Sequence, residues 1–354
     1  MKSRGIVALG FLGALAASSA MAADYPEMKL RLASTYPPPE VSMSSLSAKM
    51  WMDEITKRSG GKITFQAFWG GALGKPAEYI GLVEKGAVDL AISSSIYTPG
   101  KLPLGCFEYG FPFGPVDPVI VTKAKRQIAD EFPQIAADYA KYNIVEIMNP
   151  PGAAYHILSK KAVAGLDDFK GKRLTLAGRY FGRWVEPAGI TPVVAPAHDR
   201  YTMLQTGVVD MDLLPLDLFS AFKVYEQAKH AVMVGAMTGN FTELWVNKQV
   251  FDKMPPHVQK LFKDVGREIE LKVANEVVPE WTNKIMATFK KNGVEVIDFP
   301  DAERTKWAHL IADIPAEWAK EVSDKGYPGF EIVKRYQELT TALGYKWPRQ
   351  WGKQ

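Results

Sequence analysis

The sequence is poor in features that would tie it to several large classes of protein. Only one of its 354 residues, Cys106, is a cysteine, so no disulfide can form within the chain. An exported chain without disulfides has to be stabilised by its core. With 47% hydrophobic residues and this length, the chain is able to bury the core of two domains of ordinary size.

The short motifs of common enzymes are also missing. The sequence contains no Gly-x-Ser-x-Gly, no His-Glu-x-x-His and no Gly-x-Gly-x-x-Gly. Gly74-Lys75 resembles part of a phosphate-binding loop, but Pro76 stands where serine or threonine is required. Cys106 has no evident histidine partner for nucleophilic catalysis. We therefore expect no catalytic residues and no cofactor, and a periplasmic enzyme built on scattered Asp and His residues is a distant alternative.

Charge of one sign is scarce. The formal net charge is +4, and basic and acidic residues are interspersed along the chain. A near-neutral, mixed surface argues against nucleic acid or an anionic membrane as the main partner. Aromatic residues are fairly abundant, with 9 Trp, 14 Tyr and 17 Phe, which suits a ligand cleft but also suits a core.

A long hydrophobic run occurs only at the start of the chain. Lys2 and Arg4 precede an apolar stretch over residues 5–17, and the small-x-small pattern of a cleavage site follows at 20–22. This is the pattern of a secretory signal peptide. A membrane anchor is the alternative, but the apolar stretch falls short of the ~20 residues that a spanning helix needs. We expect residues 1–22 to be a signal peptide that is cleaved after Ala22, and the mature protein to be periplasmic.

The most informative pattern occurs twice. Residues 83–89 and 204–210 both read apolar-x-x-Gly-x-Val-Asp. In each copy a helix-like run ends at a glycine, where a left-handed residue is favoured, and a short strand is expected to begin near the Val-Asp pair. Two equivalent helix-to-strand units far apart in the chain predict two similar α/β lobes.

The periodicity of apolar residues predicts the elements of these lobes. Strands alternate with helices in the order typical of a parallel sheet with right-handed crossovers. Expected strands lie at 30–33, 63–68, 88–92, 144–147, 173–176, 192–194, 208–210 and 294–297. Expected helices lie at 42–58, 76–86, 118–142, 178–188 and 199–205, followed by a long amphipathic helix around 258–269, closed or bent near Pro279, and by a helical tail from Trp307.

Several segments, taken together, resemble the periplasmic solute-binding proteins of TRAP transporters. They lie in the family's order and cover most of the mature chain. They are SGGKI (59–63), GGALG (70–74), GAVD (86–89), LDDFKGKR (166–173), AGITP (188–192), GVVD (207–210), YEQAKH (225–230) and LWVN (244–247).

The resemblance implies a two-lobed α/β binding protein of the type II-like class, with hinge strands and a long connecting helix. Residues 23–147 plus about 238–275 would form the N-terminal lobe, and 148–237 plus about 276–354 the C-terminal lobe. The protein would capture a small organic solute, typically an organic acid and in some cases an aromatic one, and deliver it to the permease subunits of an ion-gradient-driven importer. It would be a monomer or a homodimer. A binding protein for an ATP-driven importer or a sensor has the same two-lobed shape and is the alternative.

The sequence departs from the family at the usual ligand contacts. In the family, an arginine two residues past the Lys-Gly-Leu-Lys-like run pairs with the substrate carboxylate, which a planar guanidinium matches well. Here that position is Thr175. The Glu-Trp pair that coordinates a metal in the 2-oxoacid-binding branch reads Leu213-Leu214, so the resemblance implies no metal. The ligand is then an acid held by a displaced arginine, an aromatic acid, or a neutral polar compound.

Two arginines could replace the missing one. Arg179 and Arg183 are four residues apart, hence on one face if the segment is helical. They follow a predicted strand at the point where α/β folds form their clefts and where helix N-termini attract anions. The alternative is a pair of solvated surface arginines.

Aromatic residues next to predicted strands are the other candidates. Flat rings at the carboxyl ends of strands could stack on a planar or apolar ligand, although ordinary packing between elements explains them equally well. They are Tyr36, Trp69, Tyr97 and Tyr155, together with Phe241 beside a predicted cleft strand.

Asp217 and two histidines complete the candidates. Asp217 follows the second Val-Asp strand and could accept a hydrogen bond from a hydroxyl or amine of the ligand, or could cap a helix. His156 could hydrogen-bond a ligand, whereas His230 is expected to be structural. Neither histidine has metal-ligand spacing with another His or Cys.

Overall fold

The computed structural model describes residues 24–105, 107–176, 179–195, 199–239 and 242–353. The expected signal peptide, Cys106 and Phe241 therefore lie outside the described residues. Within those residues, no helix is both long enough and apolar enough to cross a membrane.

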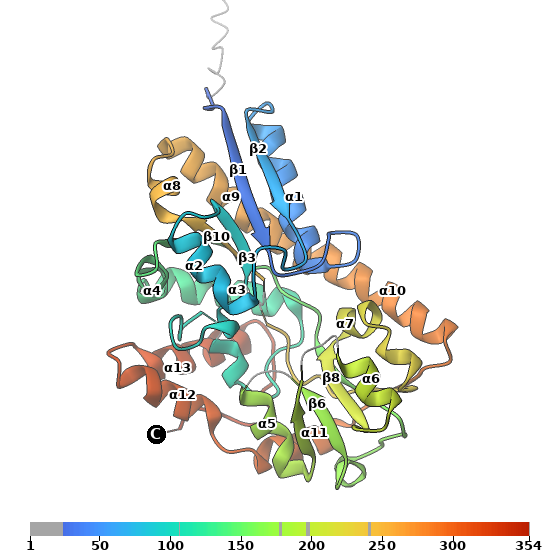
Figure 1. The fold of residues 1–354 in the computed structure, drawn as a ribbon. Coiled ribbons are helices and arrows are strands. Elements are labelled where there is room, and N and C mark those ends of the chain that lie inside the picture. Colours follow the sequence, from blue (N-terminus) through green and yellow to red (C-terminus); the bar gives the residue numbers. More distant parts are fainter. Residues whose placement is uncertain (1–23, 106, 177–178, 196–198, 240–241, 354) are drawn as a thin grey trace, which may run out of the picture.

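Two separate mixed sheets organise the described chain, one in each half of Figure 1. Sheet A has the strand order β2-β1-β3-β10-β4 and sheet B the order β11-β9-β5-β8-β6-β7. Sheet A consists of β1 (Met28–Ser34), β2 (Ile63–Phe68), β3 (Leu90–Ser93), β4 (Ile144–Met148) and β10 (Glu243–Asn247). Sheet B consists of β5 (Tyr155–Ser159), β6 (Arg173–Leu176), β7 (Thr191–Val194), β8 (Met211–Pro215), β9 (His230–Met233) and β11 (Glu295–Asp298). The two-lobed α/β fold expected from the sequence is confirmed.

Helices cover both sheets. They are α1 (Met43–Arg58), α2 (Tyr79–Glu84), α3 (Pro118–Glu131), α4 (Gln134–Ala140), α5 (Arg179–Val185), α6 (Arg200–Gln205), α7 (Leu216–Ala221), α8 (Lys248–Asp252), α9 (Pro256–Lys272), α10 (Val278–Lys291), α11 (Asp301–Leu310), α12 (Ile314–Ser323) and α13 (Gly329–Ala342). In the core beside sheet A, Trp51 of α1 lies edge-on against Phe262 of α9, with ring centroids 4.9 Å apart, and donates its Nε1–H to the Phe262 carbonyl at 3.1 Å.

The strands β4 and β10 connect sheet A to the rest of the chain. In sheet A, β1, β2 and β3 run parallel, whereas β10 runs antiparallel to both β3 and β4. β10 comes from far along the sequence and lies between β3 and β4. The chain therefore leaves sheet A after β4, builds most of sheet B, and returns to complete sheet A with β10.

The long connecting helix is confirmed, but it does not end near Pro279. A π-helical segment, Val273–Val277, joins α9 to α10 without a break. Figure 1 shows this helix in orange, passing from the half of sheet A to the half of sheet B. Pro279 is tolerated because it lies in the first turn of α10, next to the π-helical segment, where the helix is not tied to regular α-helical hydrogen bonds.

Two other sequence-based boundaries are corrected by local chemistry. The helix expected over 118–142 is divided into α3 and α4 at Pro133, whose missing N–H and ring do not fit a continuing helix. The strands expected at the two Val-Asp pairs begin only after the aspartates, at Leu90 and Met211.

The two Val-Asp pairs form matching corners, which we call the Arg–Asp corners. The Asp89 carboxylate accepts from the backbone N–H of Arg31 at 2.8 Å and from its Nε at 3.2 Å. The Asp210 carboxylate accepts from the same two groups of Arg173, at 2.9 and 3.3 Å. Since both aspartates hold a neighbouring strand in this way, the Gly-x-Val-Asp segments become corners instead of strands.

Candidate functional site

The carboxyl ends of the parallel strands of sheet A bring three candidates to one edge. Tyr36 follows β1, Trp69 follows β2, and Tyr97 follows β3. The first two are joined through the backbone, because the N–H of Gly70 donates to the Tyr36 carbonyl at 2.7 Å. Tyr97 is 43% exposed and ends a short turn, η2 (Ser95–Tyr97).

One edge of sheet B carries the other candidates. Tyr155 begins β5 and is paired with Pro215, the last residue of the antiparallel strand β8. Asp217 follows in the first turn of α7, and Arg179 is the first residue of α5, just after the parallel strand β6. The side chain of Arg179 lies outside what the structure describes.

The two edges meet at Tyr155. Burial raises the pKa of its hydroxyl, and a hydrogen bond from Tyr109 opposes this effect. Tyr97 and Asp217 raise the pKa of Tyr155 further, whereas the charge of Arg200 lowers it. Tyr97 follows β3 of sheet A and Asp217 follows β8 of sheet B, so the charges that influence Tyr155 come from both halves of the fold.

A cluster of rings lies beside this meeting point, and we call it the aromatic wall. Tyr155 and Phe181 have ring centroids 4.9 Å apart, and Tyr109 lies 6.5 Å from Tyr155 and 5.8 Å from Phe181. Trp184 packs edge-on against Phe181 at 4.7 Å. The hydroxyls of Tyr109 and Tyr155 are 3.5 Å apart. Tyr109, Phe181 and Trp184 are buried in the core, whereas Tyr155 is half-buried, so Tyr155 is the ring of this cluster that a ligand with a flat or apolar part could reach.

A buried carboxylate fixes the turn that carries Tyr97. Glu243 accepts from the backbone N–H of Ser95 at 3.0 Å and from its hydroxyl at 2.6 Å. It also accepts from the Tyr139 hydroxyl and from Trp245 Nε1, both at 2.8 Å. Glu243 has no exposed surface, so its charge depends on protein donors such as these.

Thr175, one of the candidate ligand residues, is buried within the lobe of sheet B. It has no exposed surface, and its hydroxyl donates to Asp212 Oδ1 at 2.8 Å. Arg200 Nη1 donates to the same oxygen at 2.8 Å and to the Leu213 carbonyl at 3.1 Å. Arg200 is 1% exposed, so this arginine and Asp212 form a buried ion pair within the lobe of sheet B.

Arg183 is engaged with a helix from the end of the chain. Its Nη1 and Nη2 donate to the two carboxylate oxygens of Glu317 in α12, at 2.6 and 2.8 Å. Arg183 and Glu317 line a cavity of about 250 Å³ between α5 and α12, together with Tyr180, Ile314, Trp318 and Glu321. Arg183 therefore has a protein partner. This agrees with the alternative that the sequence left open, in which Arg183 is a surface arginine.

Trp69 lies in a different groove from the aromatic wall. That groove has a volume of about 450 Å³ and runs between the proline-rich turn after β1 and the outer part of α1; it is lined by Pro38, Pro39, Glu40, Lys49, Met52, Asp53, Thr56, Phe65 and Trp69. Tyr36 packs, partly buried, against the core that surrounds sheet A.

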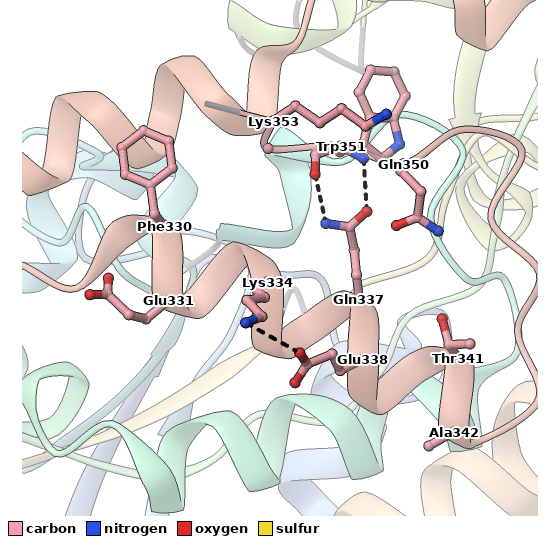
Figure 2. A pocket seen from close by; sticks show the side chains of 11 residues that line it. Phe330, Glu331, Lys334, Gln337, Glu338, Thr341, Ala342, Gln350, Trp351 and Lys353 are labelled. Atoms are coloured by element: carbon pink, nitrogen blue, oxygen red, sulfur yellow. Dashed lines mark hydrogen bonds and ion pairs between the residues drawn. The ribbon is translucent and has the colours of Figure 1, made fainter.

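A groove of about 940 Å³ is also separate from these residues. It lies between α13 and the C-terminal segment, and Figure 2 shows its lining. Gln337 holds this segment, because its side chain donates to the Trp351 carbonyl at 2.9 Å and accepts from the Trp351 N–H at 2.8 Å. A much smaller cavity, about 20 Å³, lies beside η2 and is lined in part by Ser95, Tyr109, Tyr180 and Trp318.

His156 belongs to the core of its lobe. It is 7% exposed, and its Nδ1 accepts from the N–H of Gly235 at 3.1 Å. Burial, and then the nearby charge of Arg304, lower its pKa to about 3. The His156 ring is therefore neutral, and its Nδ1 is engaged by a backbone N–H. Among the described residues, no group of three or more His, Cys, Asp or Glu side chains is arranged to hold a metal ion.

Sequence reasoning missed Tyr109, Phe181, Arg200 and Glu243. Tyr109 lies in a segment with four aromatics between residues 103 and 118, a concentration that could have marked it. Arg200 and Glu243 carry no local signal, because their partners are set by the fold.

These features describe a two-lobed α/β protein in which polar and aromatic candidates lie at the edges of its two sheets. The family model for bacterial extracellular solute-binding proteins, family 7, matches residues 34–321. Since the match covers most of the chain, the protein belongs to this family, which comprises the periplasmic solute receptors of TRAP transporters. Such proteins bind small molecules and work with membrane permease subunits.

Individual relatives agree with this assignment. A solute-binding protein of Albidiferax ferrireducens is 27% identical over 263 residues, which cover 73% of this chain and 75% of the relative. A TRAP solute-binding protein of Desulfovibrio salexigens has a similar structure, with a TM-score of 0.80 and 22% identity, over 91% of this chain and 98% of that one. A marine metagenome protein described as specific for aromatic acid ligands has a TM-score of 0.75 and 21% identity, over 90% of this chain and 100% of that one.

Proposed function

We propose that this receptor captures a small organic acid with a ring or other apolar part, by closing its two lobes around it, and delivers it to the permease subunits of a TRAP importer. The observation that carries the proposal is the half-buried Tyr155, which packs on Phe181 and is paired with Pro215 at the end of β8, the strand that leads to Asp217. Closure would remove water from the ligand between the rings and strengthen its polar contacts.

Arg179 is our candidate for holding the carboxylate. Of the two arginines expected to replace the residue at Thr175, Arg183 already forms an ion pair with Glu317. Arg179 begins α5, at the edge of sheet B that also carries Tyr155 and Asp217. A planar guanidinium in that position would match a carboxylate. Tyr36 and Trp69 would contribute only if closure moved them toward the wall, so we place them outside the first contacts.

Solved relatives of the same fold support the class of ligand. Structures of such proteins are described with bound D-glucuronate, orotic acid and 3-hydroxybenzoate. All three are acids with a ring, as the aromatic wall would require. The proposal for this chain is therefore an acid whose ring or apolar part packs on Tyr155.

The proposal can be tested by thermal unfolding of residues 23–354 against a library of organic acids, aromatic acids, sulfonates, polyols and amines. A ligand that binds the folded state stabilises it by about 2.7 kcal/mol at one hundred times its Kd. We expect ring-bearing acids to raise the Tm most. Stabilisation by neutral or basic compounds alone would contradict the proposal.

Calorimetric titration of two variants tests the role of the arginines. Arg179→Ala should weaken binding of the best acid by about tenfold or more, because a charge-assisted hydrogen bond contributes roughly 1.5–3 kcal/mol. Arg183→Ala is the matched control, four residues away on the same helix, and should leave the affinity within about twofold. The opposite ranking would move the carboxylate site to Arg183.

The remaining proposals concern export and assembly. We propose cleavage after Ala22, which mass spectrometry of the exported protein would test.

The lobes would comprise 23–147 with about 238–275, and 148–237 with about 276–354. Within the second range, α12 and α13 contact α3 and the turn Phe107–Gly110 of the first, so these tail helices bridge the two. The protein would be a monomer or homodimer, and as a receptor it would return its ligand chemically unchanged.

A further inference from the structure

We propose that Asp217 determines specificity by accepting a hydrogen bond from the solute, so that the preferred acid carries a hydroxyl or ammonium group in addition to its carboxylate. This inference rests on the proposed function and concerns the same site. It names a group of the ligand that neither the family assignment nor the aromatic wall specifies.

The fold places Asp217 beside the aromatic wall. Tyr155 is paired with Pro215 at the ends of β5 and β8, and the N–H of Leu216 donates to the Ala154 carbonyl at 3.2 Å. Leu216 and Phe219 are buried and hold α7 against the core. Asp217 lies between them on the helix and is half-buried, in contrast to these two residues.

No protein cation neutralises this carboxylate. Within the described residues, Asp217 forms no ion pair and no hydrogen bond with another side chain, whereas the buried Asp212 is paired with Arg200. Burial raises the pKa of Asp217 to about 6, and the backbone N–H groups of Asp217 and Leu218 oppose that rise. At neutral pH the group is mainly ionised, and therefore acts as an acceptor.

A half-buried carboxylate without a cation or a side-chain donor is costly once water leaves the site, because the two backbone N–H groups replace only part of its hydration. Closure of the lobes would therefore favour a solute that supplies a further donor at this point. A solute with only a carboxylate and a ring would supply no donor to Asp217 and would place two negative charges in one cleft. The site would thus bind an acid without a donor group more weakly than an acid that carries one.

The test compares matched acids on the wild-type protein and on Asp217→Asn. Two sets of probes are used: benzoate, 3-hydroxybenzoate and 3-(aminomethyl)benzoate; and butanoate, 3-hydroxybutanoate and 3-aminobutanoate. Affinities are measured by calorimetry. The wild type should bind a donor-bearing member of a set at least tenfold more tightly than the donor-free member. Asp217→Asn should weaken that member by about 10- to 100-fold and leave the donor-free acid within about twofold.

The hydroxyl and ammonium probes distinguish the two kinds of donor, because loss of the charge of Asp217 should affect the ammonium compound more. Asp301→Asn is the control. Asp301 also lies in the first turn of a helix, but its side chain is 93% exposed and pairs with Arg304. The Asp301→Asn variant should bind each probe as tightly as the wild type does. Thermal melting of each variant without ligand verifies that the variant is folded.

Three outcomes would overturn the inference. Equal affinity of the wild type for donor-bearing and donor-free acids would show that no donor is recognised, while leaving the proposed function intact. An equal loss for all acids in Asp217→Asn would show that Asp217 supports α7 instead of contacting the solute. If neither the probes nor any other organic acid bound to the wild type, the proposed function would fail and this inference with it.

Discussion

Arg31 and Arg173 make the same contacts in the two lobes. Each donates its backbone N–H and its Nε to the aspartate of a Gly-x-Val-Asp segment, and its Nη2 to the carbonyl of the glycine in that segment, at 3.2 Å for Gly86 and 2.7 Å for Gly207. The sequence repeat thus corresponds to one structural device used twice, which ties the end of a helix to the neighbouring parallel strand.

Removing either aspartate should destabilise the protein by a similar amount. Asp89→Ala and Asp210→Ala each leave a backbone N–H and a guanidinium without their acceptor, so we expect a loss of about 1–2 kcal/mol in each variant. The two corners share no partner, so the double variant should be additive within about 0.5 kcal/mol. Urea unfolding measures both. If only one of the two single variants lost stability, the corners would not be equivalent.

Glu243→Gln should loosen the turn that carries Tyr97. The amide NH₂ of glutamine cannot accept from the donors that now meet one carboxylate oxygen, so two of the four donors lose their acceptor. We expect a loss of about 1–3 kcal/mol in unfolding free energy and weaker solute binding. Tyr139→Phe removes a single donor and should cost less. Equal melting temperatures of Glu243→Gln and the wild type would contradict this account.

The buried pair of Arg200 and Asp212 should be sensitive to removal of one partner. Arg200→Ala leaves the Asp212 carboxylate buried beside Thr175 without its cation, which typically costs about 3–5 kcal/mol. Replacing both residues, as Arg200→Met with Asp212→Leu, should recover much of that loss because no charge remains buried. Chemical unfolding of the three proteins provides the comparison. If the double variant were less stable than Arg200→Ala, the cost would lie in packing and not in charge.

His156 should make the protein labile to mild acid. Its pKa is lowered from 6.5 to about 3 by burial, so the folded state keeps the ring neutral while the unfolded state binds a proton. This contribution to stability is complete above about pH 6.5 and is lost as the pH falls toward 3, at up to about 1.4 kcal/mol per pH unit.

The measurement is the unfolding free energy of the wild type and of His156→Asn from pH 7 to pH 4. An asparagine amide oxygen can accept from Gly235 N–H as Nδ1 does, but it does not titrate. The curve of the variant should therefore be flatter, and parallel curves would show that other groups dominate the acid response.

The sequence predicted those parts of the molecule that are governed by local rules. Strands such as 63–68 and 173–176 have the predicted limits, because short apolar runs between glycine-rich turns leave few other options. Tyr97 follows a strand in the structure as expected, whereas Tyr155 begins β5, a strand that the sequence did not predict.

Contacts between distant residues could not be predicted. Ser95 meets Glu243 across 148 positions, and Arg183 meets Glu317 across 134. The sequence around Arg183 does not show whether its side chain pairs with a helix from the end of the chain or binds a ligand. The same limitation applies to Asp217, where the sequence offered a helix cap and the structure shows Pro215 at the N-cap and the carboxylate without an ionic partner among the described residues.

The position of β10 has a consequence for how the protein can be made and divided. This strand separates β3 from β4, so a fragment that ends after β4 would expose two unpaired strand edges, which invite association with other chains. The N-terminal lobe cannot be completed during synthesis until residue 247 has been added and the polypeptide has already passed through the other lobe. The two lobes are therefore distinct in space but not separable by truncation, and a stand-alone version of the first would need β10 grafted directly behind β4 or β3.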